Sequence, residues 1–331
     1  SFPTRRSSDL NADALFLTAI DPYGHELWRW TFPVNKLNQQ TEQLSPLSSR
    51  PTYTETENEL TVKANKRAFI FSKKDGQLKG VSVDNRKINF ANGPRFIGAR
   101  RADRSLDQFY NHDDEKAKEK DRTYSEFPDA AVFTKLDVKE DGGNLVVTAN
   151  YKLGNLDKAQ WTINPSGELA LDYTYNFFGV VDLMGIRFDY PEDQVISKRW
   201  LGAGPYRVWQ NRIHGTQYDV WENDYNDPIP GETFTYPEFK GYFGDVSWMN
   251  IQTKEGTISL TNETPDAYIG VYQPRDGRDR LLYTLPESGI SVLNVIPPVR
   301  NKVNSTDLCG PSSQPKWVNG PQTGRVIFRF M

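Results

Sequence analysis

Cysteine is almost absent from the sequence, which has one, Cys309, in 331 residues. A single cysteine cannot form an intrachain disulfide, and it excludes a zinc site built from several cysteines. Histidine is scarce as well, with three residues in the whole chain. A disulfide-stabilised scaffold and a cysteine-rich metalloprotein are therefore both excluded.

The sequence also lacks an excess of charge and a long apolar run. Its 40 Lys and Arg residues nearly balance 43 Asp and Glu residues, for a formal net charge of -3. Such a balance gives no general electrostatic attraction to nucleic acid. No apolar run approaches the roughly 20 residues that a membrane-spanning helix needs. We therefore expect neither nucleic acid nor a membrane as a partner.

Aromatic residues, in contrast, are abundant: the chain has 8 Trp, 16 Tyr and 18 Phe. Large rings suit the half-buried faces and cores of β-sheets. Flat rings also stack on the C–H faces of sugars, so this composition is compatible with carbohydrate binding. With 37% hydrophobic and 25% charged residues, the chain has the composition of an ordinary globular protein.

The first ten residues, SFPTRRSSDL, are basic and rich in serine. Such a stretch resembles a transit peptide, which would be set aside before the fold is considered. It also reads as an in-frame translation of a widely used sequencing adapter. We therefore interpret residues 1–10 as non-native, and we expect the natural chain to continue upstream. The missing start leaves the compartment open, with a periplasmic or secreted location as the expectation.

Alternation of apolar and polar residues is the dominant local pattern. In NLVVTANYKL, every second residue from Leu145 to Leu153 falls on one face, which is typical of a half-buried antiparallel strand. Similar segments are separated by Asp-Gly, Asp-Gly-Gly and Asn-Pro-Ser-Gly, which suit hairpin turns. No amphipathic helix separates the strands, so the sequence predicts an all-β sandwich or barrel.

The chain divides into unequal parts. Residues 11–34 contain two apolar runs joined by Asp-Pro-Tyr-Gly, which predicts the last hairpin of a domain whose other strands lie upstream. Residues 35–57 are polar and rich in Pro and Ser, which indicates a linker. Residues 58–331 then form one large β-domain. Its charge run DDEKAKEKDR is expected to be a solvated loop or short surface helix.

The densest motif lies between residues 200 and 212, in WLGAGPYRVWQNR. Its glycines and proline predict a rigid turn around which tryptophan and tyrosine rings converge. Such a cluster either binds a ligand or fixes a corner of the sandwich. The residues that form the motif are Trp200, Gly202, Gly204, Pro205, Trp209 and Arg212.

At this motif the chain resembles the C-terminal region of family 2 glycoside hydrolases of the β-galactosidase type. Two further segments carry the resemblance. ELWRWTFPV is similar to the closing strands of the immunoglobulin-like domain that precedes the terminal domain, and RAFIFSKKDGQLKGVSVDNRKI is similar to the entry of the terminal domain itself. The three segments occur in the family's order, and the resemblance covers residues 11–331.

The resemblance implies a large antiparallel supersandwich of the galactose-mutarotase-like type, preceded by a hairpin remnant of an immunoglobulin-like sandwich. It further implies a separate catalytic (β/α)8 barrel, which carries an acid/base and a nucleophile glutamate. On that basis the chain is the non-catalytic C-terminal part of an enzyme that hydrolyses terminal β-glycosidic bonds. Its expected partners are the upstream barrel and a carbohydrate, a β-galactoside or a related glycan.

The resemblance also suggests residues that contact the sugar. The family's terminal domain sends an aromatic residue from its last loops into the barrel's pocket, and the matching segment DLCGPSSQPKWVNG offers Trp317. After Gly-Pro, the family's R-x-P-x-D-N-D run is replaced here by GPRFIGARRADRSLDQF, in which Arg100 or Arg101 and Asp103 stand in for parts of it. The missing Pro and Asn-Asp leave the terminal sugar open between galactose and another sugar.

Two alternative functions remain open. The chain could be a stand-alone carbohydrate-binding module, or a mutarotase-like epimerase with His214 and either Glu222 or Glu238 as acid and base. Asn262-Glu263 resembles the dipeptide that carries the family's acid/base, but without a barrel we interpret it as a strand-end turn.

No cofactor is required by any motif in the chain. The acidic segments WENDYNDP and NHDDE supply oxygen ligands for Na⁺ or Ca²⁺, but neither has the spacing of a defined ion-binding loop. Acidic surface loops explain both segments, so we assign no metal ligand. Phosphate loops, dinucleotide fingerprints and nucleophile elbows do not occur.

Overall fold

The computed structural model describes residues 14–33, 49–101, 124–224, 241–271, 285–299 and 310–331. Within these ranges the chain is built from antiparallel strands, and the helical structure is limited to two short 3₁₀ turns, η3 (Glu192–Gln194) and η6 (Pro311–Ser313). The predicted all-β antiparallel architecture is therefore confirmed. Among the described residues, no helix has the length and apolar character needed to cross a membrane.

One of the two large sheets contains the first strands of the predicted domain. Its strand order is β19 (Tyr268–Val271), β20 (Ile290–Val295), β14 (Leu183–Asp189), β8 (Ala91–Arg101), β6 (Leu78–Val83), β5 (Arg67–Ser72), β4 (Glu59–Ala64) and β3 (Thr52–Glu55). Two short strands lie beside this path: β7 (Arg86–Ile88) pairs with β6, and β9 (Tyr124–Glu126) pairs with β8.

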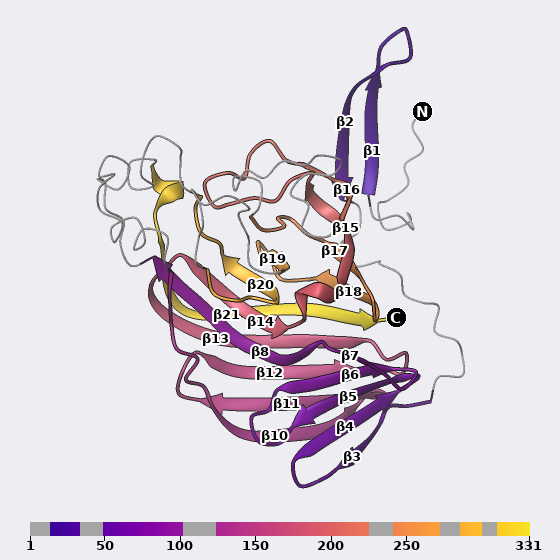
Figure 1. Cartoon of the computed structure of the whole chain (residues 1–331), viewed down its shortest axis with the longest axis vertical. Helices are drawn as coiled ribbons and strands as arrows, with labels where there is room; N and C mark the ends of the chain where they lie inside the picture. Colours follow the sequence, from indigo (N-terminus) through magenta and orange to yellow (C-terminus); the bar gives the residue numbers. More distant parts are fainter. Residues whose placement is uncertain (1–13, 34–48, 102–123, 225–240, 272–284, 300–309) are drawn as a thin grey trace.

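The second sheet contains the middle and the end of the chain. Its strand order is β10 (Val132–Asp141), β11 (Asn144–Lys152), β12 (Leu156–Ile163), β13 (Leu169–Val181), β21 (Lys316–Phe330), β18 (Gly256–Asn262), β17 (Trp248–Thr253), β15 (Val195–Gly204) and β16 (Gln217–Asp224). The last strand, β21, thus lies at the centre of the sheet, between β13 and β18 (Figure 1).

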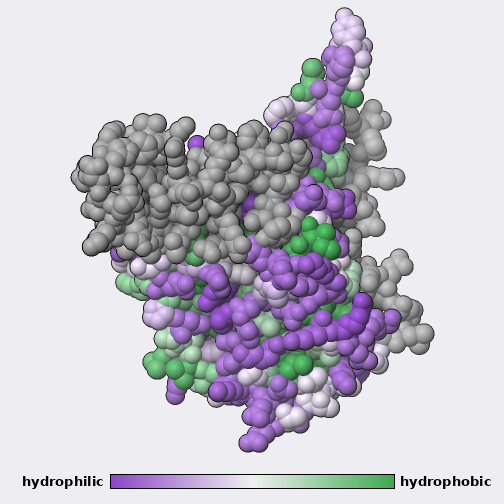
Figure 2. Space-filling view, in the orientation of Figure 1, coloured by the Kyte–Doolittle hydropathy of each residue, from purple (hydrophilic) through white to green (hydrophobic). Residues whose placement is uncertain are grey.

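Aromatic side chains from the two sheets meet in the core. Phe71 of the first sheet lies 5.9 Å from Trp161 of the second, measured between ring centroids, and Phe96 lies 5.5 Å from Tyr175. Offset and edge-to-face ring pairs at such distances stabilise a core beyond their area burial. Much of the aromatic content therefore serves packing. The outer surface that faces the viewer in Figure 2 is mostly hydrophilic over the described residues.

A separate hairpin precedes the sandwich and projects from it (Figure 1). Strands β1 (Ala14–Ile20) and β2 (Glu26–Pro33) pair with each other, within the segment predicted to be a hairpin. The carboxylate of Asp21 closes the turn by accepting the backbone N–H groups of Tyr23 and His25, both at 2.8 Å. Many of the hairpin's large apolar side chains, including Trp28 and Trp30, are exposed.

Two details differ from the sequence prediction. Residues 52–55, assigned to the linker, form β3 and pair with β4, because Thr-Tyr-Thr-Glu has high β propensity and finds a free sheet edge. Leu153, assigned to the apolar face of its strand, is 73% exposed. The strand ends at Lys152, and Leu153 adopts a positive φ of 60° in the turn that follows.

Candidate functional site

The glycines of the 200–212 motif allow a close approach between chain segments. A Cβ atom on Gly202 would lie 3.0 Å from the carbonyl oxygen of Gly244, and one on Gly204 would lie 2.4 Å from the ring of Trp221. The side chain of Trp200 is fully buried; its indole N–H donates to the carbonyl of Ala203 at 3.0 Å. The motif is therefore a tightly packed corner of the sandwich.

The second half of the motif is equally buried. The ring of Trp209 lies edge-on to Tyr242 with centroids 5.7 Å apart, and both side chains are inaccessible to a ligand. The backbone N–H of Arg212 donates to the carbonyl of Trp209 at 2.8 Å, which closes a tight turn, while the Arg212 side chain is exposed. Of the two interpretations of this cluster, the structure thus supports the fixed corner.

The polar residues between Trp209 and Arg212 have a role that the sequence did not reveal. The Gln210 amide donates to the carbonyls of Ser312 and Gln314, both at 2.8 Å. Asn211 both donates to the carbonyl of Val299 at 2.7 Å and accepts the N–H of Val299 at 2.8 Å. We call Gln210 and Asn211 the amide clamp, because they hold the two segments on either side of residues 300–309. The second of these segments leads directly into β21.

Trp317 lies at the start of β21, opposite Val180 in the neighbouring strand. Its side chain is 63% exposed, and that of Phe178 is 73% exposed. The two rings meet edge to face, with centroids 5.6 Å apart and an interplanar angle of 79°. Two large rings in contact form an exposed apolar patch rather than a single exposed side chain, and such patches occur where a ligand or another protein segment binds.

Arg101 lies at the same end of the sandwich as Trp317. Its backbone N–H donates to the carboxylate of Asp182 at 2.9 Å, and both residues are buried. Asp182 follows Val181, which pairs with Lys316, the neighbour of Trp317. The structure therefore brings Arg101 and Trp317 to one end of the sandwich, which we call the Trp317 end (left in Figure 1). Asp103 lies outside the described residues.

The residues weighed for catalysis have other roles or lie outside the described chain. Asn262 closes a turn by accepting the N–H of Thr264 at 3.1 Å, and Glu263 forms a 3.0 Å ion pair with Arg325. His214 is exposed, and its carbonyl accepts the Tyr206 hydroxyl at 3.4 Å. Glu222 is exposed on β16, whereas Glu238 lies outside the described residues.

The described part of the chain contains no group of three or more His, Cys, Asp or Glu side chains placed to hold a metal ion. The segment NHDDE and the second half of WENDYNDP are not among the residues that the structure describes.

Comparison with protein families identifies the sandwich. The model of the family described as beta galactosidase small chain matches residues 63–297, which is more than half of the chain. The chain belongs to this family. The predicted relationship to β-galactosidases is thereby confirmed.

The match to the beta galactosidase small chain family contains the packed corner, the amide clamp, Arg101 and Phe178. Trp317 lies beyond its C-terminal limit, on the strand that the clamp positions. Of the two residues of the aromatic pair, Phe178 therefore lies within the matched region and Trp317 lies outside it. No significant match was found among curated protein sequences.

Several solved structures are similar to this member of the family. Galactose 1-epimerase from Lactobacillus acidophilus NCFM matches with a TM-score of 0.46 and 8% identity, over 86% of this chain and 99% of the epimerase. A GalM/aldose epimerase homologue from C. elegans matches with a TM-score of 0.41 and 8% identity, over 85% of this chain and 99% of the homologue. Identity of 8% carries no residue role from these proteins to this chain.

Proposed function

We propose that this chain is the part of a β-galactosidase-type glycoside hydrolase that shapes the sugar pocket without performing the chemistry. In this proposal the terminal β-glycosidic bond is hydrolysed on a separate catalytic barrel that packs against the sandwich. The two glutamates needed for a retaining mechanism would lie on that barrel. A β-galactoside or a related glycan is the proposed substrate.

The observation that carries the proposal is the exposed pair of Phe178 and Trp317. Together the two rings place a large apolar surface at one end of the sandwich, in a 79° edge-to-face geometry. A sugar presents apolar C–H faces between its hydroxyl groups, and an aromatic face is complementary to them. The amide clamp and the pairing of β21 with β13 hold Trp317 in place, so that little ordering entropy is lost on binding.

The polar side of the proposed pocket comes from the end of β8. Arg101 is held there by the buried carboxylate of Asp182. Arg101 and Asp103 are proposed to complete the pocket beside Trp317, as the resemblance suggests. Polar groups at the rim of an aromatic surface give orientation and specificity to a sugar.

The experiment compares Trp317→Ala and Trp317→Phe in the complete enzyme that carries both this chain and its barrel. An aromatic contact contributes roughly 0.5–1.5 kcal/mol, so Trp317→Ala raises KM for a β-galactoside by about 2- to 10-fold, whereas kcat changes little. Trp317→Phe keeps a ring and retains most of the affinity. Trp28→Ala, in the projecting hairpin, is the matched control. An unchanged KM in Trp317→Ala contradicts the proposal.

A stand-alone carbohydrate-binding module is the second candidate, because the aromatic pair is exposed in this chain by itself. If this function is correct, the isolated chain migrates more slowly in a gel that contains polysaccharide than in a gel without it, and Trp317→Ala abolishes this difference. Under the pocket-completing function the isolated chain binds weakly at this surface, because the barrel supplies the remaining contacts.

A further inference from the structure

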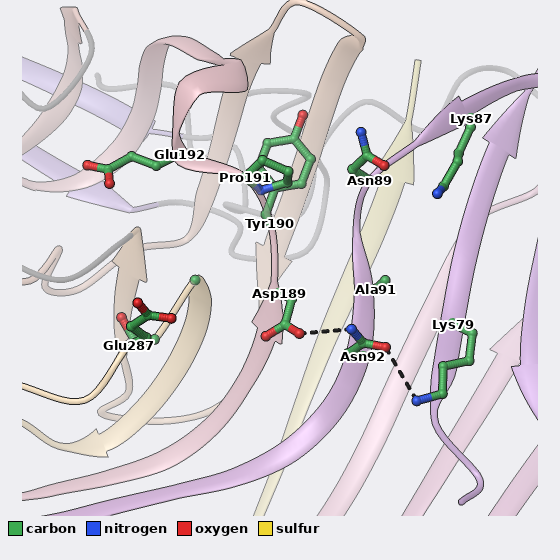
Figure 3. Close-up of a pocket in the computed structure, with 12 residues that line it drawn as sticks. Lys79, Lys87, Asn89, Ala91, Asn92, Asp189, Tyr190, Pro191, Glu192 and Glu287 are labelled. Atoms are coloured by element: carbon green, nitrogen blue, oxygen red, sulfur yellow. Dashed lines mark hydrogen bonds between the residues drawn. The ribbon is translucent and has the colours of Figure 1, made fainter. Parts of the chain in front are cut away.

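A cavity of about 570 Å³ lies between the start of β8, the end of β14 and the short strand β7 (Figure 3). This volume falls within the range of small-molecule sites, which is roughly 300–1,000 Å³. Polar or charged residues form much of its wall, among them Lys79, Lys87, Asn89, Asn92, Asp189 and Glu287. None of the residues considered for the sugar pocket above lies in this wall.

The cavity is remote from the Trp317 end. Asp189 pairs with Ala91 at one end of the β14–β8 ladder, whereas Leu183 pairs with Ala99 near the other. Six residues of extended strand separate Asp189 from Leu183, which corresponds to roughly 20 Å. A ligand in the cavity therefore cannot touch Trp317.

Hydrogen bonds hold the wall of the cavity rigid. Asn92 donates to the carboxylate of Asp189 at 2.9 Å and accepts from the Lys79 ammonium at 3.3 Å, as Figure 3 shows. The Lys79 ammonium is held in turn by Asp75 at 2.8 Å. A wall whose side chains are already positioned loses little conformational entropy when a ligand binds.

The second sheet fixes a further part of this wall. The carboxylate of Glu255, between β17 and β18, accepts the backbone N–H of Asn89 at 3.0 Å and the hydroxyl of Tyr190 at 3.0 Å. Asn89 and Tyr190 lie next to strands of the first sheet, and the second sheet also holds them through Glu255. Contacts between the two sheets therefore fix this part of the wall.

Not all polar groups of the wall are satisfied within the protein. Lys87 and Glu287 form no ion pair with any residue that the structure describes, and they come from opposite sides of the cavity (Figure 3). The hydroxyl of Ser288, which also lines the cavity, is buried without a hydrogen-bond partner in the described chain. The Ser288 hydroxyl is thus available to a ligand or a water molecule in the cavity. The side chains of Lys87 and Glu287 are exposed and are likewise available to a ligand.

The chemistry of the wall indicates the class of ligand. Its two lysines stand beside three carboxylates, those of Asp189, Glu192 and Glu287, and Asp189 is also paired with Arg95. Positive and negative charges therefore balance, so that neither an anion nor a cation is favoured by net charge. Ala91 and Pro191 add apolar surface to the same wall. We propose that this cavity binds a neutral saccharide, with hydroxyl groups between Lys87 and Glu287 and a C–H face toward Pro191.

The experiment uses the full chain and ligand-observed NMR with a panel of neutral sugars: galactose, glucose, lactose and cellobiose. At least one of them binds, and Lys87→Met and Glu287→Gln each weaken the binding by about tenfold, since a hydrogen bond to a charged group contributes that much. Both side chains are exposed, so neither substitution disturbs the core. Because the ligand is uncharged, its affinity is insensitive to added salt.

Two control variants separate this site from others. Lys139→Met removes an exposed lysine of β10 and leaves the binding unchanged. Trp317→Ala removes binding at the Trp317 end, so binding that persists in this variant and is weakened by Lys87→Met belongs to the cavity, and a failure of the proposed sugar pocket is distinguishable from a failure of this site. The inference is overturned if none of the four sugars binds, if Trp317→Ala abolishes binding that Lys87→Met preserves, or if the binding falls with added salt.

Discussion

Asn211 binds the backbone of Val299 through both ends of its side-chain amide, in the manner of a neighbouring strand. Val299 is buried, so its N–H and carbonyl have no access to water once the amide is removed. The adjacent Gln210 donates from its amide nitrogen to two carbonyls in the segment before Trp317, those of Ser312 and Gln314. At the scale of single residues, two amides thus link the packed corner to the proposed sugar surface.

Asn211→Ala is expected to destabilise the chain by about 1–3 kcal/mol, because buried polar groups that lose their partner cost roughly this much each. Urea unfolding followed by circular dichroism measures the change. Asn211→Asp keeps the acceptor for the Val299 N–H but places a carboxylate oxygen against the Val299 carbonyl, so it is also expected to be less stable than the natural chain. Equal stability of all three would contradict the role assigned to the amide clamp.

Among the elements, β13 pairs with β21 at the centre of the second sheet and carries the buried Tyr173 and Tyr175. Burial raises the pKa of Tyr173 to about 12, which outweighs the opposing effect of its contact with the Thr264 hydroxyl. Burial also raises the pKa of Tyr175, to which the neighbouring Tyr173 contributes. In alkaline solution, the folded chain therefore retains phenol protons on β13 that the unfolded chain releases.

This difference predicts a loss of stability in alkali. Below a pH of about 10, the ordinary tyrosine pKa, both states of Tyr173 are protonated and the full stability is present. As the pH rises from there toward 12, only the unfolded state loses the proton, so the free energy of unfolding decreases. Urea unfolding at a series of alkaline pH values measures the slope, and Tyr173→Phe is expected to make it shallower. An unchanged slope in that variant would contradict the burial effect.

Sequence patterns predicted most of these elements for a physical reason. Alternation reports which face of a strand meets the core, and β4, β5 and β11 follow it. The pattern failed at Leu153, where a turn with a positive φ overrides the apolar character of the side chain. It also failed at residues 52–55, where a free sheet edge recruits a segment that composition assigns to a linker.

For the molecule as a whole, the candidate site was predictable only in part. Trp317 was recognised from a resemblance, and the exposed position of its ring agrees with that expectation without testing the role. The amide clamp and the polar cavity could not be predicted, because each joins residues that are distant in sequence. Asn211 and Val299, or Asn89 and Glu255, become neighbours only once both sheets are in place.

At this scale the central claim is that the sandwich shapes a sugar pocket while the bond-breaking carboxylates belong to a separate barrel. The most direct measurement is hydrolysis of a nitrophenyl β-galactoside by the purified chain alone and by the complete enzyme with its barrel. The account predicts no hydrolysis by the chain alone, and activity in the complete enzyme whose KM rises in Trp317→Ala. Hydrolysis by the isolated chain that survives repeated purification would contradict it.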